Sequence, residues 1–195
     1  MCRKNRLAMK DAGTRKLAET PMTFRDTNNP DRWIALPMVS SERREYLPMA
    51  YLDGETVPTN QVQTIPGATL FHFGVLNSSI HNAWMRAVCG RLEMRYRYSK
   101  DIVYNNFIWP QPNDAQKQRI EHCAQAVLDA RAAHPGATLA QLYDPDKMPA
   151  KLREAHHALD AAVEAAYGVN FEGDEEKIVA HLFQLYAQAT ASKGK

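Results

Sequence analysis

Charged and apolar side chains alternate over eight consecutive residues, and this pattern is the one most suited to contacting another molecule. The charged positions are Arg91, Glu93, Arg95 and Arg97, and the apolar positions are Leu92, Met94, Tyr96 and Tyr98. Successive side chains of a β-strand point to opposite faces, so the alternation predicts one continuous strand whose apolar face packs against a neighbouring helix. Arginine can make two hydrogen bonds to a guanine edge, and glutamate can accept one from the cytosine amino group. The pattern therefore indicates either a DNA-contacting strand or an exposed, solvated one.

Other polar side chains lie before and after this stretch. The candidates for phosphate contact are Ser41, Arg43, Arg44, Arg91, Ser99, Lys100, Arg15 and Lys16, and the candidates for further base contact are the amides Asn60 and Gln61. Basic side chains bond phosphates, and an amide can bond an adenine edge. Each group also has an ordinary structural interpretation, because arginines are common in surface turns, amides cap turns and charged termini are usually solvated.

The sequence lacks the spacing of catalytic and metal-binding motifs. The cysteines form no Cys-x-x-Cys pair, the closest histidines are His156 and His157, and there is no His-Glu-x-x-His, glycine-rich phosphate loop or Gly-x-Ser-x-Gly. His72, His81 and Trp84 are interpreted as packing and hydrogen-bonding residues of a helix. We expect no catalytic residue, metal or cofactor within this chain.

Composition separates the chain into two parts. The net charge of the 195 residues is only +2, but residues 1–110 have 15 Lys and Arg against 10 Asp and Glu, whereas residues 111–195 have 9 against 12. A polyanionic partner is therefore expected to meet the first part. No apolar run approaches a membrane span, and three cysteines without a framework fit a reducing compartment, so we expect a soluble, cytoplasmic protein with no membrane partner. The abrupt basic start has the character of a cut end.

Periodicity predicts an α+β fold: a small mixed α/β domain in residues 1–110, with short strands and a helix, followed by an all-α domain in residues 111–195. The first part is expected to contain a loop at 21–31, strands at 33–39, 46–52 and 61–65, and a helix at 68–89, whole or broken around 77–79. Pro37 is expected to place its strand near a sheet edge, and Gly90 to end the helix in a left-handed conformation.

Capping signals divide the second part into helices. Asn113 with Gln116 predicts a capping box before an apolar stripe at 120–128, and Pro135-Gly136 is expected to end this helix. A short turn at 138–143 and a helix over 152–167, ended by Gly168, are expected to follow. Asp174 is expected to cap the last helix, whose predicted buried side is Ile178, Leu182, Leu185 and Ala189. These helices form either a small bundle or a coat on the first part.

Several runs resemble the MmeI-like group of Type IIL/IIG adenine-specific DNA methyltransferases of restriction–modification systems. Residues 48–53, 65–74, 78–84, 89–92 and 97–107 are similar to its target recognition domain, and residues 142–156 and 166–168 are similar to its helical C-terminal domain. In that family, a preceding catalytic domain binds S-adenosylmethionine through a glycine motif and holds adenine with Asn-Pro-Pro-Tyr/Phe. Neither motif occurs in this sequence. The resemblance therefore implies a recognition fragment whose partners are double-stranded DNA and the N-terminal methyltransferase domain of the same protein.

The resemblance also implies roles for particular residues. The base-contacting positions after the family's Gly-Arg-Leu motif fall on Glu93, Arg95 and Arg97, a second set falls on Asn60 and Gln61, and a third lies near residues 41–44. Many relatives have lysine and aspartate where this chain has Glu93 and Arg95, as expected of positions that set sequence preference. The pattern of residues alone leaves open the alternative of a protein-interaction module without direct DNA contact, in which the alternating strand docks on another subunit.

Overall fold

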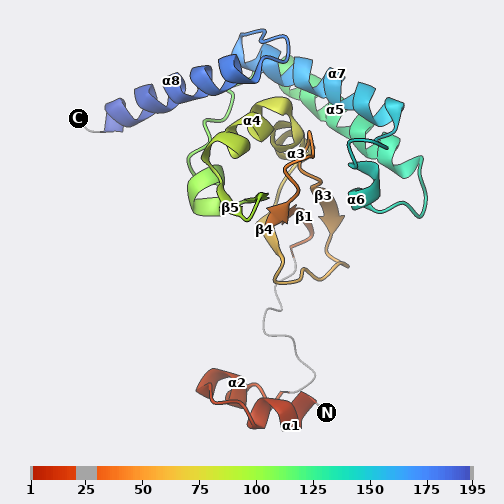
Figure 1. The fold of residues 1–195 in the computed structure, drawn as a ribbon, viewed down its shortest axis with the longest axis vertical. Helices are drawn as coiled ribbons and strands as arrows, with labels where there is room; N and C mark the ends of the chain where they lie inside the picture. Colours follow the sequence, from red (N-terminus) through yellow and green to blue (C-terminus); the bar gives the residue numbers. More distant parts are fainter. Residues whose placement is uncertain (1, 21–29, 194–195) are drawn as a thin grey trace.

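The computed structural model describes residues 2–20 and 30–193, and it has the predicted α+β fold (Figure 1). Two short helices, α1 (Cys2–Leu7) and α2 (Ala12–Lys16), form the N-terminal segment. Most of the loop predicted at 21–31 lies outside the described residues. Beyond it, four strands, two central helices and two further strands form two three-stranded sheets with the central helices between them in sequence, and the C-terminal helices follow.

The first sheet has the order β3-β1-β4, with β1 (Arg32–Pro37) in the centre between β3 (Ala50–Asp53) and β4 (Val62–Pro66). The prediction that Pro37 marks an edge strand is wrong. The pairing of β1 with β3 ends at Ala35, so Pro37 is paired with β4 alone. Proline has no N–H, and no hydrogen bond to β3 is lost because β3 does not extend that far. The strand predicted at 46–52 starts only at Ala50, because the preceding backbone bonds to a helix: Leu47 N–H donates to Asn82 Oδ1 at 2.8 Å.

The predicted break in the central helix is confirmed at Ser78. This residue ends α3 (Leu70–Asn77) and begins α4 (Ser79–Val88), with extended backbone and a side chain that accepts from His81 N–H. α3 lies unusually close to the C-terminal helices, because a Cβ added at Gly74 would come within 2.8 Å of Ile120. Gly74 therefore lets the two parts of the chain pack directly on each other.

The second sheet has the order β2-β6-β5 and contains β2 (Val39–Ser40), β5 (Gly90–Leu92) and β6 (Arg95–Arg97). The prediction that Gly90 ends α4 in a left-handed conformation is wrong. Cys89 ends the helix with extended backbone, and Gly90 is already the first residue of β5. A π-helical segment, η1 (Lys100–Tyr104), follows β6.

The C-terminal helices are α5 (Asp114–Ala132), α6 (Leu139–Leu142), α7 (Ala150–Tyr167) and α8 (Glu175–Lys193). The Asn113–Gln116 capping box, the αL residue Gly168 and the Asp174 cap are confirmed. α5 and α7 pack together over α3, while α8 packs on α4 (Figure 1). Of the two predicted arrangements, the helices thus form a coat, and one hydrophobic core runs through both parts of the chain. No helix within residues 2–20 or 30–193 is long and apolar enough to cross a membrane.

Candidate nucleic-acid interface

The alternating stretch forms a β-hairpin, so the prediction of one continuous strand is wrong. β5 and β6 pair antiparallel, with Gly90 opposite Arg97, Arg91 opposite Tyr96 and Leu92 opposite Arg95. Glu93 and Met94 form the two-residue turn, and Glu93 has a positive φ of 58°. A turn of this length needs a positive φ at its first or at both central residues. The periodic pattern concealed the turn because neither turn residue is glycine, asparagine or aspartate.

The turn changes which side chains share a face. Residues paired across a hairpin point to the same side, and Leu92 and Arg95 are an odd number of positions apart. Alternation therefore shifts by one position at the turn. Arg91 lies on the same side as Tyr96, with its guanidinium 4.0 Å from the centre of that ring, and not beside Arg95 and Arg97 as predicted. Leu92 joins the face of Arg95 and Arg97, so its predicted burial with Met94 is also wrong: Leu92 is 41% exposed and Met94 is 72% exposed.

Tyr96 and Tyr98 anchor the hairpin, as predicted for the apolar face. They are 8% and 2% exposed. The hydroxyl of Tyr98 donates to His81 Nε2 at 3.1 Å, and His81 Nδ1 donates to the Leu76 carbonyl at 2.9 Å. Burial lowers the pKa of His81 to about 3, so the imidazole is neutral and can hold both bonds. The structural role predicted for His81 is confirmed, as is that of Trp84, whose Nε1 donates to the Val103 carbonyl at 2.9 Å.

The outward face of β6 presents two guanidinium groups, one in an ion pair and one without a partner among the described residues. Arg95 Nη2 lies 2.8 Å from Glu93 Oε2, so the hairpin itself neutralises this charge. Arg97 is exposed, and its side chain makes no hydrogen bond or ion pair with any other residue that the structure describes. Gly90 lies opposite Arg97 on this face and has no side chain that could cover it. Arg97 therefore offers an uncompensated, accessible donor group in the middle strand of the sheet.

The amide candidates lie next to this hairpin. Met38 joins the two sheets, because its N–H donates to the Gln61 carbonyl at 3.1 Å and its carbonyl accepts from Tyr98 N–H at 2.9 Å. Asn60 and Gln61 are both exposed, and Met38 links the turn before β4 to the residue that follows β6. The structure thus brings together two groups of predicted base-contacting residues that are more than thirty positions apart in sequence.

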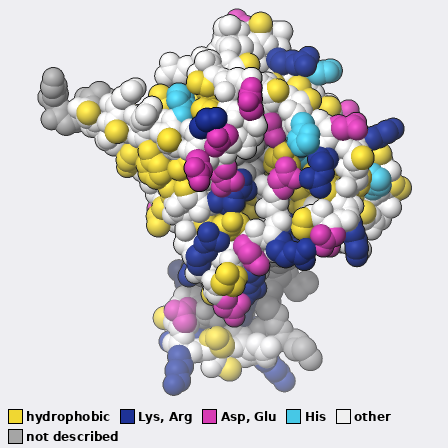
Figure 2. Space-filling view, turned by 45° about the horizontal axis from the view of Figure 1, so that its top comes forward, with side chains coloured by type: hydrophobic (Ala, Val, Ile, Leu, Met, Phe, Trp, Pro, Cys, Tyr) yellow, Lys and Arg dark blue, Asp and Glu magenta, His cyan; other side chains and the backbone are white. Residues whose placement is uncertain are grey.

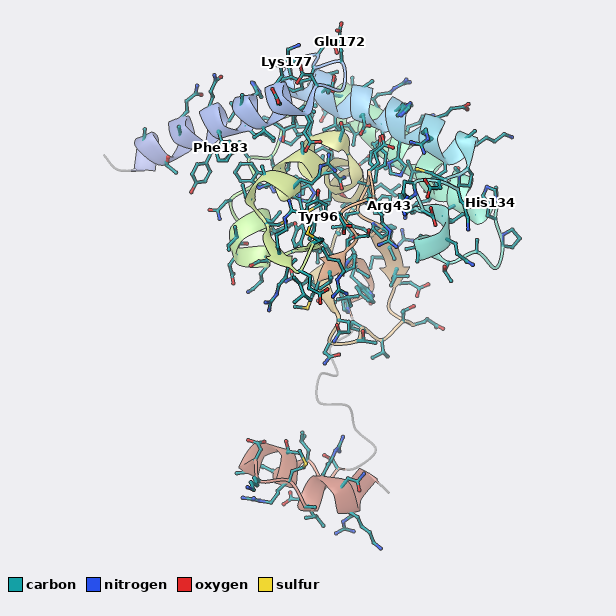
Figure 3. The ribbon with its side chains drawn as sticks, in the orientation of Figure 1. Arg43, Tyr96, His134, Glu172, Lys177 and Phe183 are labelled. Atoms are coloured by element: carbon teal, nitrogen blue, oxygen red, sulfur yellow. The ribbon has the colours of Figure 1, made fainter. Side chains whose placement is uncertain are left out.

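Most of the predicted phosphate contacts are already engaged within the protein. In the turn after β2, Arg43 forms an exposed ion pair with Asp146 at 2.6 Å, Arg44 donates to Ser40 Oγ at 3.4 Å, and Ser41 Oγ accepts from Arg43 N–H at 3.2 Å (Figure 3). The Arg43–Asp146 pair attaches the turn to the C-terminal part of the chain, and the other two bonds are within the turn and the adjoining end of β2. Basic and acidic side chains are interspersed on the face shown in Figure 2, with no single basic patch there.

The remaining candidates for phosphate contact are on two short helical segments. Lys100 begins η1 and is exposed, with Nζ 3.7 Å from Asp101, while the Ser99 carbonyl accepts from Val103 N–H at 2.8 Å. On α2, Arg15 donates to the carbonyls of Met9 and Lys10, and Lys16 is exposed. Lys100 and Lys16 are therefore the more accessible cations of this group.

One buried arginine was missed at the level of sequence. Arg131 of α5 is 8% exposed and donates to the Met49 carbonyl at 2.8 Å, to Asn77 Oδ1 at 3.2 Å and to the Tyr143 hydroxyl at 2.8 Å. Its partners come from both parts of the chain, so it holds the start of β3 and the end of α3 against the coat. The signal was its position four residues after Val127, which continues the apolar stripe of α5.

The polar network continues from Tyr143 into α7. The Tyr143 hydroxyl lies 2.7 Å from Nε2 of His156, whose pKa burial lowers well below its usual value, so the hydroxyl donates to a neutral ring. His156 also stacks on Tyr46, with ring centres 4.0 Å apart. The Tyr46 hydroxyl donates to Asp160 at 2.7 Å, and Asp160 accepts from Ser79 N–H, at the start of α4, at 2.6 Å. Burial raises the pKa of Asp160 to about 6.

Comparisons with known proteins agree with this architecture. Residues 1–111 match the family model of the MmeI target recognition domain, and residues 112–192 match that of the MmeI C-terminal domain. DNA methyltransferase A of Bacillus subtilis (strain 168) is 42% identical over 182 residues, which are 92% of this chain and 20% of that protein. The Type IIL restriction-modification enzyme MmeI, solved in complex with DNA, is 43% identical with a TM-score of 0.87, covering 97% of this chain and 25% of that one.

The chain spans a fifth to a quarter of the length of these two relatives, and the similarity covers both of its parts. The chain therefore belongs to the MmeI family, with the MmeI target recognition domain followed by the MmeI C-terminal domain.

Proposed function

We propose that this chain is the sequence-specific DNA recognition module of an adenine-N6 DNA methyltransferase of the restriction–modification type. The observation that carries the proposal is the β5–β6 hairpin, in which buried Tyr96 and Tyr98 fix the backbone while Arg95 and Arg97 face outward. The family supports it, because MmeI was solved in complex with DNA and a relative at 42% identity is a DNA methyltransferase.

The hairpin suits the major groove in size and in chemistry. A groove about 12 Å wide admits a two-stranded ribbon. Arg97 is the first candidate for a two-bond contact with guanine, because its guanidinium has no competing partner among the described residues. Arg95 and Glu93 form a donor–acceptor pair that can separate to contact guanine and cytosine on one base pair. Asn60 and Gln61, linked to the hairpin through Met38, extend the contact to neighbouring bases.

The register on DNA would come from contacts with phosphates. Lys100 and Lys16 are exposed cations, Ser99 and Arg15 are next to them in sequence, and Arg91 lies on the strand paired with β6. Ser41, Arg43 and Arg44 would take part once DNA competes with the exposed Arg43–Asp146 pair, which is a weak interaction in water.

The chemistry of methyl transfer is assigned to a region outside these 195 residues. That region would bind S-adenosylmethionine, flip the target adenine out of the duplex and methylate N6. We assign recognition to residues 1–110 and support of the recognition sheet to residues 111–195, within a single shared core. The proposed location is the cytoplasm, where a DNA-modifying enzyme meets the bacterial chromosome.

Salt dependence tests the proposal. Each phosphate neutralised by a basic side chain releases bound counterions, so the logarithm of the DNA association constant should fall steeply with the logarithm of salt concentration. In the full-length protein containing this chain, Lys100→Ala should reduce that slope by about 1. Lys177→Ala on α8 is the matched control and should leave it unchanged (Figure 3). If the protein does not bind DNA, or if its DNA affinity does not depend on salt concentration, the alternative of a protein-interaction module is favoured.

A further inference from the structure

The hairpin exposes two large apolar side chains beside its charged groups. Met94 is 72% exposed and Leu92 is 41% exposed, and they are separated by one residue. Burial of a side chain of this size is favourable, so their exposure costs stability that a binding partner could recover. Their exposure is not a consequence of a loose hairpin, since the neighbouring Tyr96 is buried and Leu92 is paired with Arg95.

The turn places Leu92 on the same side as the arginines and leaves Met94 exposed at its tip. Leu92 faces outward with Arg95 because the two are paired across the hairpin, and Met94 occupies the tip between Glu93 and Arg95. The outward surface of the hairpin therefore carries three kinds of group within a few residues: donors on Arg95 and Arg97, an acceptor on Glu93, and an alkyl edge.

Base pairs in the major groove offer complementary groups. Guanine presents acceptors, cytosine presents a donor, and the C5-methyl group of thymine is the apolar group. We propose that Leu92 and Met94 form an apolar edge that contacts a thymine C5-methyl group next to the base pair contacted by Arg95. This inference rests on the proposed function and extends it, since it assigns to the hairpin a preference for thymine that hydrogen-bonding residues alone do not provide.

An apolar protein partner fits the same surface less well. Docking on such a partner would bury Arg97 without an anion and would desolvate the Glu93–Arg95 pair, and both are unfavourable. In the major groove, the same charged groups meet polar base edges while the alkyl groups meet a methyl group. The mixed composition of the hairpin thus favours DNA as the occupant.

The test compares thymine with uracil, which differ only in the C5-methyl group. Duplexes bound by the full-length protein containing this chain are selected from a random-sequence library, and each thymine in the selected site is replaced by uracil in turn. Loss of one buried methyl group should weaken binding about fourfold at one position. Met94→Ser with Leu92→Ser should bind the thymine and uracil duplexes equally, whereas Met94→Leu should keep the difference. Phe183→Leu, an exposed apolar position on α8, should also keep it.

The possible outcomes separate the two proposals. Suppose that a sequence is selected and that its selection depends on Arg97. If uracil is then tolerated at every position, or if the site contains no thymine beside the base pair that depends on Arg95, the apolar contact is wrong and DNA recognition stands. If the double serine variant still discriminates uracil, the contact is assigned to the wrong residues and this inference is overturned. If no sequence is selected at all, both proposals fail.

Discussion

Arg131 and Arg97 have the same side chain in opposite surroundings. Arg131 lies inside the molecule and donates to acceptors from both parts of the chain, whereas Arg97 lies on the hairpin surface without a partner among the described residues. The guanidinium of Arg131 is fully used in stabilising the fold. That of Arg97 contributes little to the fold and is available for binding. In this protein, hydrogen bonds within the fold therefore distinguish a structural arginine from one available for recognition, which charge alone does not.

The two regions also differ in how they are supported. The Arg131 network runs through Tyr143, His156, Tyr46 and Asp160 and connects the coat to the sheets and central helices. The hairpin depends on Tyr96 of β6 and on Tyr98, which directly follows this strand. We expect changes in the network to affect folding, and changes in the outward face of the hairpin to affect only binding.

The largest expected effect comes from Arg131→Ala. It removes the donor from three buried acceptors, and each acceptor left unpaired costs at least about 1 kcal/mol, so the free energy of unfolding should fall by at least about 3 kcal/mol. Urea unfolding measures the change. Arg119→Ala on the exposed face of the same helix is the control and should change stability by less than about 0.5 kcal/mol. Equal effects of the two substitutions would contradict the distinction between buried and exposed arginines.

Asp160→Asn tests the buried network through its pH dependence. The pKa of Asp160 is about 6 in the folded protein, above its usual value of 3.8, so the folded state binds more protons between these pH values. The stabilising contribution is therefore complete below about pH 4 and is lost as pH rises through 6, a change of about 3 kcal/mol. Asparagine does not titrate and can keep the bonds to Ser79 and Tyr46. Its variant should match the wild type at pH 4 and be more stable above pH 7.

The stability of the Asp160→Asn variant must be compared with that of the wild type at each pH, because other buried groups change stability with pH in the opposite direction. The lowered pKa values of His81 and His156 make stability rise with pH over part of the same range. These contributions are common to both proteins and cancel in the difference. A difference between variant and wild type that does not change from pH 4 to pH 8 would show that Asp160 does not titrate as expected.

Arg97→Ala tests the exposed region. Loss of a two-bond base contact should weaken binding to the selected DNA site by about 1–3 kcal/mol and relax the preference at one base position. Stability should change by less than about 0.5 kcal/mol, because the side chain has no partner in the described fold. Binding assays on the preferred duplex and its single-base variants measure both aspects. Unchanged affinity and unchanged preference would remove Arg97 from the proposed interface.

The smallest expected effect comes from Glu93→Gly. Glutamate at a positive φ costs about 1–2 kcal/mol, and glycine avoids this cost but loses part of the gain to its greater freedom in the unfolded chain. We expect a gain in stability of about 0.5 kcal/mol together with a loss of base preference. Thermal unfolding and site selection measure the two changes. A clear loss of stability would mean that the Glu93–Arg95 pair contributes more than the strained turn costs.

The sequence predicted the helices and their ends better than the sheets. The Asn113–Gln116 box, the break at Ser78 and the stop at Gly168 are local signals, because a cap or a left-handed residue acts within one turn of helix. The place of Pro37 in a central strand depended on where β3 begins, because the first residue of β3 lies opposite Ala35, and that start depended on Asn82. Both follow from contacts between residues distant in sequence.

The sequence by itself determined that this chain has an α+β fold in the MmeI family, with an arginine-rich segment held by Tyr96 and Tyr98. Only the tertiary structure decided that this segment is a hairpin. The turn at Glu93–Met94 exchanges the faces of Arg91 and Leu92, and Met38 places Gln61 beside it. The physical reason is that side-chain alternation is a property of one strand, whereas the face that a residue shares across a turn is set by the pairing of two.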